Sequence, residues 1–302
     1  MTDPVSEITQ RDVLRRFLLH RAGVRGVHVR LDETWRHIRE RDQYPPAAMT
    51  LLGQACAAAA LFTGHAKVDG RLSVQMRSDG AIRTLFAECT AAGTLRGIVQ
   101  LSEDAGDVSS DLHDLGRGGI LAITIENRGP DGDPVRYQGL VPLEASGLDR
   151  AFEDYFRQSE QLPTRLLLAA DGDATAGLML QKLPGDDADD DAWNRAGALF
   201  DTLSAEELLA SDGDLVLHRL FHEEEPELLA TRALSFGCSC SRARVESMLV
   251  AIGLDEARLS AAKGEALIRC EFCGQSYVFT PAEIEQLFST LGREMQAPAR
   301  PQ

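Results

Sequence analysis

The sequence lacks the features that mark membrane and secreted proteins. No uninterrupted apolar run of about 18 residues is present, so no membrane span is expected. The first residues, Met1 to Glu7, have neither the basic start nor the apolar core of a signal peptide. Together with an ordinary hydrophobic share of 44%, these absences predict a globular cytoplasmic protein that binds no membrane.

Positive charge is also scarce in this chain. Its 31 lysines and arginines face 47 acidic residues, which gives a net charge of −16. A nucleic-acid-binding protein usually presents a basic face that neutralises phosphates, so we expect no nucleic-acid partner. The acidic excess is concentrated in residues 185–237, where fourteen acidic residues face three arginines.

Familiar catalytic motifs are missing as well. The chain contains neither a Gly-x-Ser-x-Gly elbow nor a His-Glu-x-x-His helix. A glycine-rich stretch at 115–119 matches neither the dinucleotide nor the P-loop pattern, and it leads into an apolar strand instead of a helix. The sequence therefore predicts a protein that is not an enzyme.

Cysteine is rare, but four of the six cysteines form two close pairs, Cys238-x-Cys240 and Cys270-x-x-Cys273. A tetrahedral zinc ion prefers four thiolates at about 2.3 Å, and each pair offers two sulfurs from one turn. A glycine lies beside each pair, where the backbone must bend around a metal. The spacing predicts one Zn²⁺ per chain, and it fits a reducing cytosol better than a secreted disulfide framework. The other two cysteines, Cys56 and Cys89, are predicted to be packed core thiols.

The paired spacing leaves two interpretations open. One is a static zinc staple, and spacing alone favours it. The other is a switch, because zinc-bound thiolates remain oxidisable and each local pair could close into a disulfide. Zinc binding in such small modules contributes about 10–16 kcal/mol of folding free energy, so its loss would unfold the module.

The hydrophobic pattern predicts an α+β fold with three parts and a tail. Residues 1–184 read as a mixed α/β core domain with a largely antiparallel sheet: strands near 27–31, 72–101, 120–141 and 165–183, and helices near 35–39, 47–66 and 148–161. Residues 185–237 read as an acidic, metastable helical linker, and 238–294 as a C-terminal zinc-binding domain. Residues 295–302 are expected to form a disordered tail. Within the linker, apolar residues recur at helical spacing and are candidates for binding unfolded proteins: Trp193, Leu199, Phe200, Leu220 and Phe221.

With these patterns in place, the chain resembles the heat-shock protein 33 family of redox-regulated holdase chaperones over essentially its whole length. The features that carry the resemblance are Glu153-Asp-Tyr-Phe156, Ser159-Glu-Gln-Leu-Pro-Thr164, Gly177-Leu-Met-Leu-Gln181, His222-Glu-Glu-Glu225, Phe236-x-Cys238-x-Cys240-Ser241, Cys270-Glu-Phe-Cys273 and Tyr277-x-Phe279. Ala243 departs from the family pattern, where a glutamate is expected, but it is not one of the expected ligands.

The resemblance implies that Cys238, Cys240, Cys270 and Cys273 hold zinc when reduced. On oxidation it implies disulfides Cys238–Cys240 and Cys270–Cys273, loss of zinc, and unfolding that exposes a surface for unfolded client proteins without ATP. It further implies a homodimer when oxidised, and we expect a monomer when reduced. The resemblance reverses the preference, so the switch is now favoured over the staple.

Two alternative functions remain. A thiol-disulfide oxidoreductase would use Cys270-x-x-Cys273, but such enzymes usually place the first cysteine at a helix N-terminus, and this pair is predicted to lie in a hairpin. A nucleic-acid-binding zinc ribbon is disfavoured by the charge balance.

Overall fold

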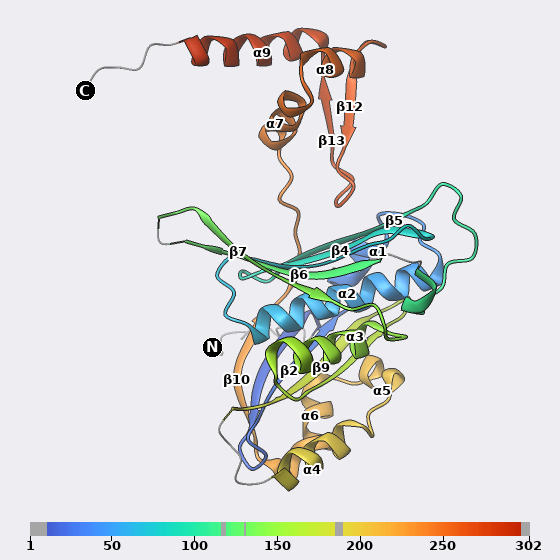
Figure 1. Cartoon of the computed structure of the whole chain (residues 1–302), viewed down its shortest axis with the longest axis vertical. Helices are drawn as coiled ribbons and strands as arrows, with labels where there is room; N and C mark the ends of the chain where they lie inside the picture. Colours follow the sequence, from blue (N-terminus) through green and yellow to red (C-terminus); the bar gives the residue numbers. More distant parts are fainter. Residues whose placement is uncertain (1–10, 116–118, 130, 185–189, 297–302) are drawn as a thin grey trace, which may run out of the picture. The chain divides into compact units, whose positions relative to one another are not determined.

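The computed structural model describes residues 11–115, 119–129, 131–184 and 190–296 (Figure 1). The chain divides into two compact units, of which the first ends at Gly237 and the second begins at Cys238. Each unit is described by itself below. Part of the glycine-rich stretch, the predicted core-to-linker boundary at 184/185 and most of the predicted tail lie outside the described residues.

The first unit is built on two sheets. The five-stranded sheet has the order β10-β1-β2-β9-β8, and all of its pairs are antiparallel. Its strands are β1 (Val13–Leu19), β2 (Val24–Leu31), β8 (Thr164–Ala170), β9 (Thr175–Lys182) and β10 (Pro226–Ala233). Three of these strands, β2, β8 and β9, lie in stretches predicted to be strands, whereas β1 and β10 were not predicted as strands.

The six-stranded sheet has the order β11-β5-β4-β3-β6-β7, and only the short β11–β5 pair is parallel. Its strands are β3 (Arg71–Arg77), β4 (Ile82–Thr90), β5 (Thr94–Leu101), β6 (Ile120–Arg128), β7 (Pro134–Val141) and β11 (Ser235–Phe236). Alternation along β3 buries Leu72, Val74 and Met76 on one face, as period-two patterning requires. The predicted fold class, α+β with a largely antiparallel sheet, is confirmed.

A single apolar helix, α2 (Pro46–His65), packs against strands of both sheets and forms the centre of the core (Figure 1). Proline at its first position and a run of alanines favour the helix. Small side chains let both sheets approach closely: a Cβ on Gly53 would meet that of Ala170 at 2.5 Å. By length and composition α2 is apolar enough to cross a membrane, but it is the buried core helix of this unit.

Helix α1 (Glu33–Arg39) shows how a distant residue can begin a helix. Asp32 occupies the N-cap position, but its side chain makes no capping bond. Instead, the Asp12 carboxylate accepts hydrogen bonds from the backbone N–H groups of Asp32, Glu33 and Thr34 at 3.0–3.1 Å. The backbone N–H groups at the start of α1 are therefore satisfied by Asp12, the residue directly before β1. No local sequence pattern could reveal this contact.

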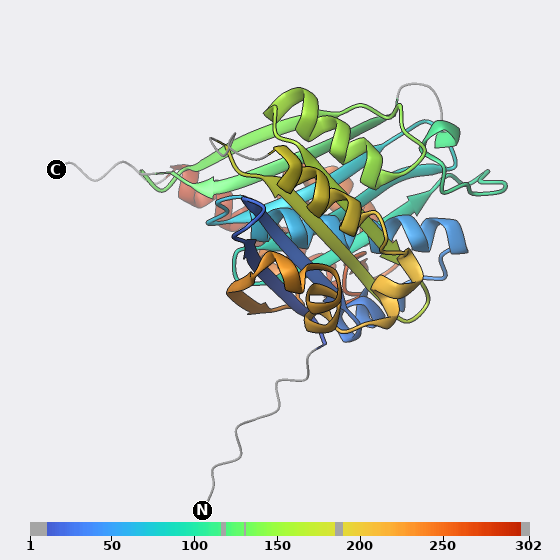
Figure 2. The ribbon, with the colours of Figure 1, turned by 90° about the horizontal axis from the view of Figure 1, so that it is seen from below.

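Three further helices cover the face of the five-stranded sheet that α2 does not occupy, and Figure 2 shows them lying across its strands. They are α4 (Asp190–Phe200), α5 (Ala205–Ala210) and α6 (Gly213–Phe221), followed by the turn η3 (His222–Glu224). Their apolar residues form one cluster with sheet residues such as Phe17, Leu178 and Leu180. The predicted helices of the acidic segment are present, but its last part, from Pro226, is strand β10 and not helix.

The remaining helical parts of the first unit are η1 (Leu112–Leu115), α3 (Leu148–Tyr155) and a π-helical turn, η2 (Phe156–Glu160). Helix α3 packs against β7, β8 and α2. Its aromatic residues insert beside α2, and the rings of Phe62 and Phe152 meet edge to face with centroids 4.9 Å apart.

The second unit is small and has its own core. It contains α7 (Arg242–Ile252), α8 (Leu254–Ser260), the hairpin β12 (Ala266–Arg269) and β13 (Ser276–Phe279), and α9 (Pro281–Gln296). Side chains cap two of these helices, α7 and α9. The Ser241 hydroxyl accepts from the Arg244 N–H, and Thr280 and Glu283 form a reciprocal capping box. Among the side chains that the structure describes, six buried apolar residues make up the core cluster, so side-chain burial alone stabilises this unit weakly.

Candidate metal centre

Two short turns carry the four paired cysteines. Cys238 and Cys240 immediately precede α7, and Cys270 and Cys273 lie in the turn between β12 and β13. In that turn the Cys270 N–H donates to the Gln275 carbonyl at 2.9 Å, and the Gly274 N–H donates to the Cys270 carbonyl at 2.8 Å. Gly274 has φ +72°, a conformation that glycine adopts without strain, and this closes the turn with both thiols on one side.

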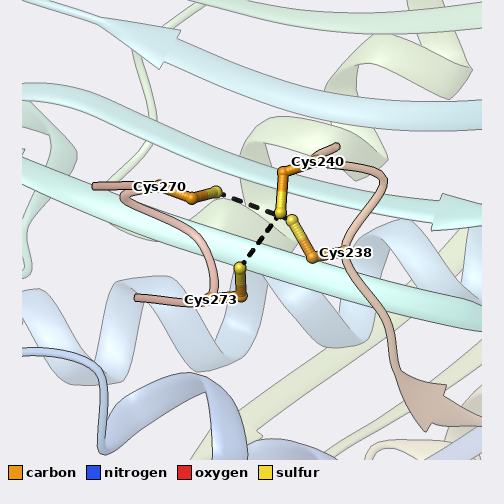
Figure 3. Close-up of side chains that lie close together, drawn as sticks. All are labelled: Cys238, Cys240, Cys270 and Cys273. Atoms are coloured by element: carbon orange, nitrogen blue, oxygen red, sulfur yellow. Dashed lines mark hydrogen bonds between the residues drawn. The ribbon is translucent and has the colours of Figure 1, made fainter. Parts of the chain in front are cut away.

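The four sulfurs converge on one point (Figure 3). All four Sγ atoms lie within 4.8 Å of one another, with Cys238 and Cys270 at 3.7 Å and Cys240 and Cys273 at 3.3 Å. Four thiolates at about 2.3 Å from a tetrahedral ion would be spaced by roughly 3.8 Å, so the donor set and its spacing fit zinc. The four sequence-predicted ligands are thus brought together in one cluster able to hold a metal ion.

Hydrogen bonding makes the four thiols unequal. The Tyr277 hydroxyl donates to Cys240 Sγ at 3.2 Å. Burial acts to raise the pKa of Cys240, but the hydrogen bonds from Tyr277 and the neighbouring thiols outweigh it and lower that pKa to about 7. Burial raises the pKa of Cys273 to about 12, and it also raises that of Cys238. The bond to Cys240 raises the pKa of Tyr277 to about 12, so its hydroxyl stays protonated and able to donate.

The two remaining cysteines lie in the core of the first unit. Cys56 on α2 and Cys89 on β4 are fully buried among apolar residues. Burial raises the pKa of both thiols, that of Cys89 to about 12, which keeps them protonated and unreactive. Their surroundings match the predicted role of packed core thiols.

The candidate client-binding residues are covered in this structure. Phe200, Leu220 and Phe221 are buried in the cluster between the five-stranded sheet and helices α4 and α6, and Trp193 and Leu199 pack against that cluster. Any role for these five residues in binding a client therefore requires that α4–α6 first leave the sheet.

A charged contact between the sheet and α6 was missed from the sequence. The Arg15 guanidinium is only 3% exposed and lies 2.8 Å from a carboxylate oxygen of Asp214 and 3.6 Å from one of Asp212. His28 lies beside it, fully buried under Gly213, whose added Cβ would meet the His28 ring at 2.6 Å. We call the group formed by Arg15, His28, Asp212 and Asp214 the α6 latch. Arg15 and Asp214 are 199 residues apart in the chain, so no local sequence motif predicts this group.

A second ion pair joins the two ends of the segment that contains α4, α5 and α6. Arg195 of α4 donates to both carboxylate oxygens of Glu224, at 2.5 and 3.0 Å. The Glu224 side chain is only 3% exposed. This bidentate ion pair joins α4 to η3, the turn that follows α6. The segment is therefore held by contacts between its own two ends as well as by contacts with the sheet.

An α+β core and a small unit organised around four convergent thiols define the class of protein: a two-unit protein whose second unit carries a four-cysteine cluster able to hold a metal ion. The family model described as "Hsp33 protein" matches residues 12–280. The chain belongs to the Hsp33 family of chaperones.

Individual relatives agree with this assignment. The chain is 41% identical over 297 residues to the "33 kDa chaperonin" of Ectopseudomonas mendocina (strain ymp), covering 96% of this chain and 99% of that one. It is 38% identical over 285 residues to the "33 kDa chaperonin" of Neisseria meningitidis serogroup A, covering 93% of each. The fold is similar to the crystal structure of the Hsp33 homolog from Thermotoga maritima, with a TM-score of 0.76 at 20% identity over 94% of this chain and 99% of that one.

Proposed function

We propose that this chaperone is a redox-regulated holdase that captures unfolding proteins under oxidative stress without ATP. The reduced, metal-bound form is inactive. Oxidation of Cys238, Cys240, Cys270 and Cys273 removes the metal ligands and starts the conformational change that opens a client-binding surface.

The observation that carries this proposal is a four-thiol cluster in a unit with a very small core. Bound zinc would supply folding free energy of about 10–16 kcal/mol in a module of this kind. Among the described residues its core has six buried apolar side chains, three of them alanines, and a core this small rarely holds a module folded without a metal or disulfides. The thiolates are thus both the main stabilising element of the second unit and its oxidisable groups.

The redox step balances with a peroxide as oxidant. One thiolate of a pair attacks hydrogen peroxide, breaks its O–O bond, forms a sulfenic acid and releases hydroxide; the other thiol then attacks the sulfenic sulfur and displaces water to form the disulfide. Two pairs consume two peroxides and close the disulfides Cys238–Cys240 and Cys270–Cys273. The resemblance to the family implies this pairing, and the short spacing of each pair allows it without rearrangement of the chain.

Helices α4–α6 couple the switch to client binding. They cover the apolar face of the five-stranded sheet with Trp193, Leu199, Phe200, Leu220 and Phe221. When the second unit unfolds, we propose that this acidic segment also leaves the sheet, so that both faces of the contact become available to unfolded chains. The high negative charge keeps the opened form soluble.

The proposal extends to the setting in which the protein works. Its partners are unfolded or partly unfolded client proteins, and it has neither a nucleic-acid nor a membrane partner. It is a monomer when reduced and a homodimer when oxidised. It acts in the cytoplasm and is not an enzyme. In this structure Cys270-x-x-Cys273 lies in a β-hairpin turn and not at a helix N-terminus, which argues against the oxidoreductase alternative.

The test compares reduced, zinc-loaded protein with protein treated with peroxide at elevated temperature. Light scattering of a chemically unfolded client is recorded while zinc release is followed in the same sample. The proposal expects that only the oxidised sample has lost zinc and suppresses aggregation. Equal behaviour of both samples, with zinc still bound, would identify the cluster as a static staple.

Two matched variants test whether the zinc release and the chaperone response depend on the paired cysteines. C273S is expected to lower zinc affinity and to disturb the redox response, because it removes one of four ligands and one disulfide partner. C56A changes a thiol outside the cluster and is expected to keep the wild-type response. A C56A protein that lost the response while remaining folded would contradict the assignment.

A further inference from the structure

A pocket of about 470 Å³ opens at one end of the first unit, beside the C-terminal end of α2. Its walls come from both sheets, from α2 and from the segment between α3 and β8. Volumes of roughly 300–1,000 Å³ are typical of small-molecule sites. The proposed redox switch uses none of the residues that line it.

The deep walls of this pocket are apolar. Phe62, Leu72 and Phe156 line it and are each at most 8% exposed. The Phe62 and Phe156 rings meet edge to face with centroids 5.4 Å apart, which fixes the aromatic wall. Ile123 and Ile125 of β6 add an aliphatic wall. Such a lining accepts a short hydrocarbon chain and excludes water from it.

One side of the pocket carries an uncompensated positive charge. The Arg25 guanidinium donates to Gln181 Oε1 at 3.3 Å and lies 3.3 Å from His65 Nε2, and both of these groups are neutral. Its Nε atom is buried without a hydrogen-bond partner. Among the residues that the structure describes, no carboxylate pairs with Arg25. A half-buried guanidinium without a carboxylate partner is costly, and an incoming carboxylate would reduce that cost.

The polar groups around Arg25 do not supply the missing negative charge. Gln181 is only 2% exposed and orients the guanidinium through its amide oxygen. Burial, Arg25 and Arg16 hold the pKa of His65 at about 3, so the imidazole is neutral at pH 7 and carries no charge that could pair with Arg25. Glu160 is the one carboxylate among the described residues that line the pocket, and it accepts hydrogen bonds from the hydroxyls of Tyr155 and Tyr137 at 3.2 and 3.3 Å.

The local backbone at the pocket is unusual. Residues 156–160 form a π-helical turn, a conformation that is frequent at functional sites. Gln161 follows with φ +56°, which is rare for a residue other than glycine. This turn places Phe156, Glu160 and Leu162 in the pocket wall. The turn leads into the Ser-Glu-Gln-Leu-Pro-Thr stretch at 159–164, one of the features that carry the family resemblance. The proposed thiol switch assigns no role to this stretch.

We propose that this pocket binds a small amphipathic carboxylate, such as a medium-chain fatty acid. The carboxylate pairs with Arg25 beside Gln181, and the aliphatic chain lies against the aromatic and isoleucine walls. The α2 pocket, as we name it, is a ligand site of the first unit and goes beyond the chaperone function proposed above.

The experiment titrates reduced, zinc-loaded full-length protein with sodium octanoate by calorimetry. Octan-1-ol and acetate serve as probes of the chain and the headgroup alone. One saturable octanoate site is expected, with octan-1-ol at least about tenfold weaker, because a charge-assisted hydrogen bond is lost. Equal affinity for octanoate and octan-1-ol, or no saturable octanoate binding, would overturn the proposal.

Variants and a wild-type measurement locate the site. R25Q is expected to weaken octanoate binding about tenfold or more while leaving octan-1-ol binding unchanged. R83Q, which removes an arginine that is half exposed on β4, is expected to bind like wild type. If R25Q does not fold, methyl NMR of the wild type decides. Saturable shifts at Leu72, Ile123 and Ile125 support the α2 pocket, and saturable shifts only elsewhere contradict it.

Discussion

At the scale of single residues, Tyr277 sets one of the four thiols apart. Its hydroxyl hydrogen bond to Cys240 Sγ, at 3.2 Å, withdraws electron density from a sulfur that could bind a metal. Groups of this kind, which bond to a ligand without touching the ion, hold ligands in place and tune their reactivity. The sequence placed Tyr277 in the hairpin, but only the structure shows which sulfur it contacts.

The variant Y277F is expected to lower zinc affinity by about tenfold and to speed zinc release by peroxide, because Cys240 loses its hydrogen-bond donor. Competition with a chromophoric chelator measures the first effect and stopped-flow zinc release the second. Y137F makes the same chemical change in the first unit and is expected to leave both values unaltered. Wild-type affinity and release in Y277F would show that the hydroxyl does not tune the cluster.

His28 predicts a pH dependence for the α6 latch. Burial, Arg15 and Arg30 hold its pKa at about 3 in the folded state, against about 6.5 when unfolded. The unfolded state therefore binds more protons below pH 6.5, so this contribution to stability is present above pH 6.5 and is lost as the pH falls toward 3. The expected loss is about 1.4 kcal/mol per pH unit within that window.

Hydrogen exchange of α6 amides, corrected for intrinsic rates, measures this effect between pH 7.5 and 5.5. The charged groups that act on His28 are Arg15 and Arg30 of the sheet, and the Asp212 and Asp214 carboxylates pair with Arg15 beside it. H28L is expected to flatten the pH dependence, whereas H222L, which changes an exposed histidine, keeps it. An identical slope in H28L and wild type would assign the dependence to the carboxylates instead.

At the scale of elements, the latch predicts how firmly α6 is held. D214N leaves the buried Arg15 short of one carboxylate and is expected to cost about 1.5–3 kcal/mol of local stability. The result should be weaker exchange protection of α6 and earlier exposure of the sheet face to a hydrophobic dye. E223Q, at an exposed carboxylate on the neighbouring turn, is expected to change stability by less than about 0.5 kcal/mol.

The elements also show what the sequence could and could not reveal. Strand β3 and the Thr280–Glu283 capping box were readable because their signals are local, with alternation in one case and a four-residue pattern in the other. Strand β10 was missed because nearly all its side chains are exposed, so it shows no alternation, and its partner β1 lies about 200 residues away. The Asp12 cap of α1 and the α6 latch were missed for the same reason, since sequence patterns do not report long-range contacts.

The four cysteines are the opposite case. Their two short spacings are themselves the signal, because a turn that carries two thiols has few other uses in a reduced protein. The structure brings all four within 4.8 Å, as the spacing requires. The Tyr277 contact and the inequality of the thiols depend on the register of β12 and β13, which the sequence does not specify.

At the scale of the whole molecule, the two units are expected to differ in their dependence on metal. Removing zinc from reduced protein with a chelator should unfold the second unit, whose core is small, while the first unit keeps its large core. Thermal scans followed by circular dichroism should show a lost or lowered transition for residues 238–296 and a retained one for the first unit. Retention of exchange protection in α7 and β13 after chelation would show that the metal is not required for folding.

The position of β10 has a consequence for reversibility. The segment from α4 to α6 is bounded by β9 before it and by β10 after it, and both strands belong to the same five-stranded sheet. If the sheet persists when the helices detach, the segment becomes a loop tethered at both ends. Loop closure costs rise only slowly with length, so the helices remain at an effective concentration near the millimolar range above their own docking face. The return of the helices to the sheet would then be a first-order process. A released client could rebind only in competition with these helices, which stay attached to the chain and occupy the same surface.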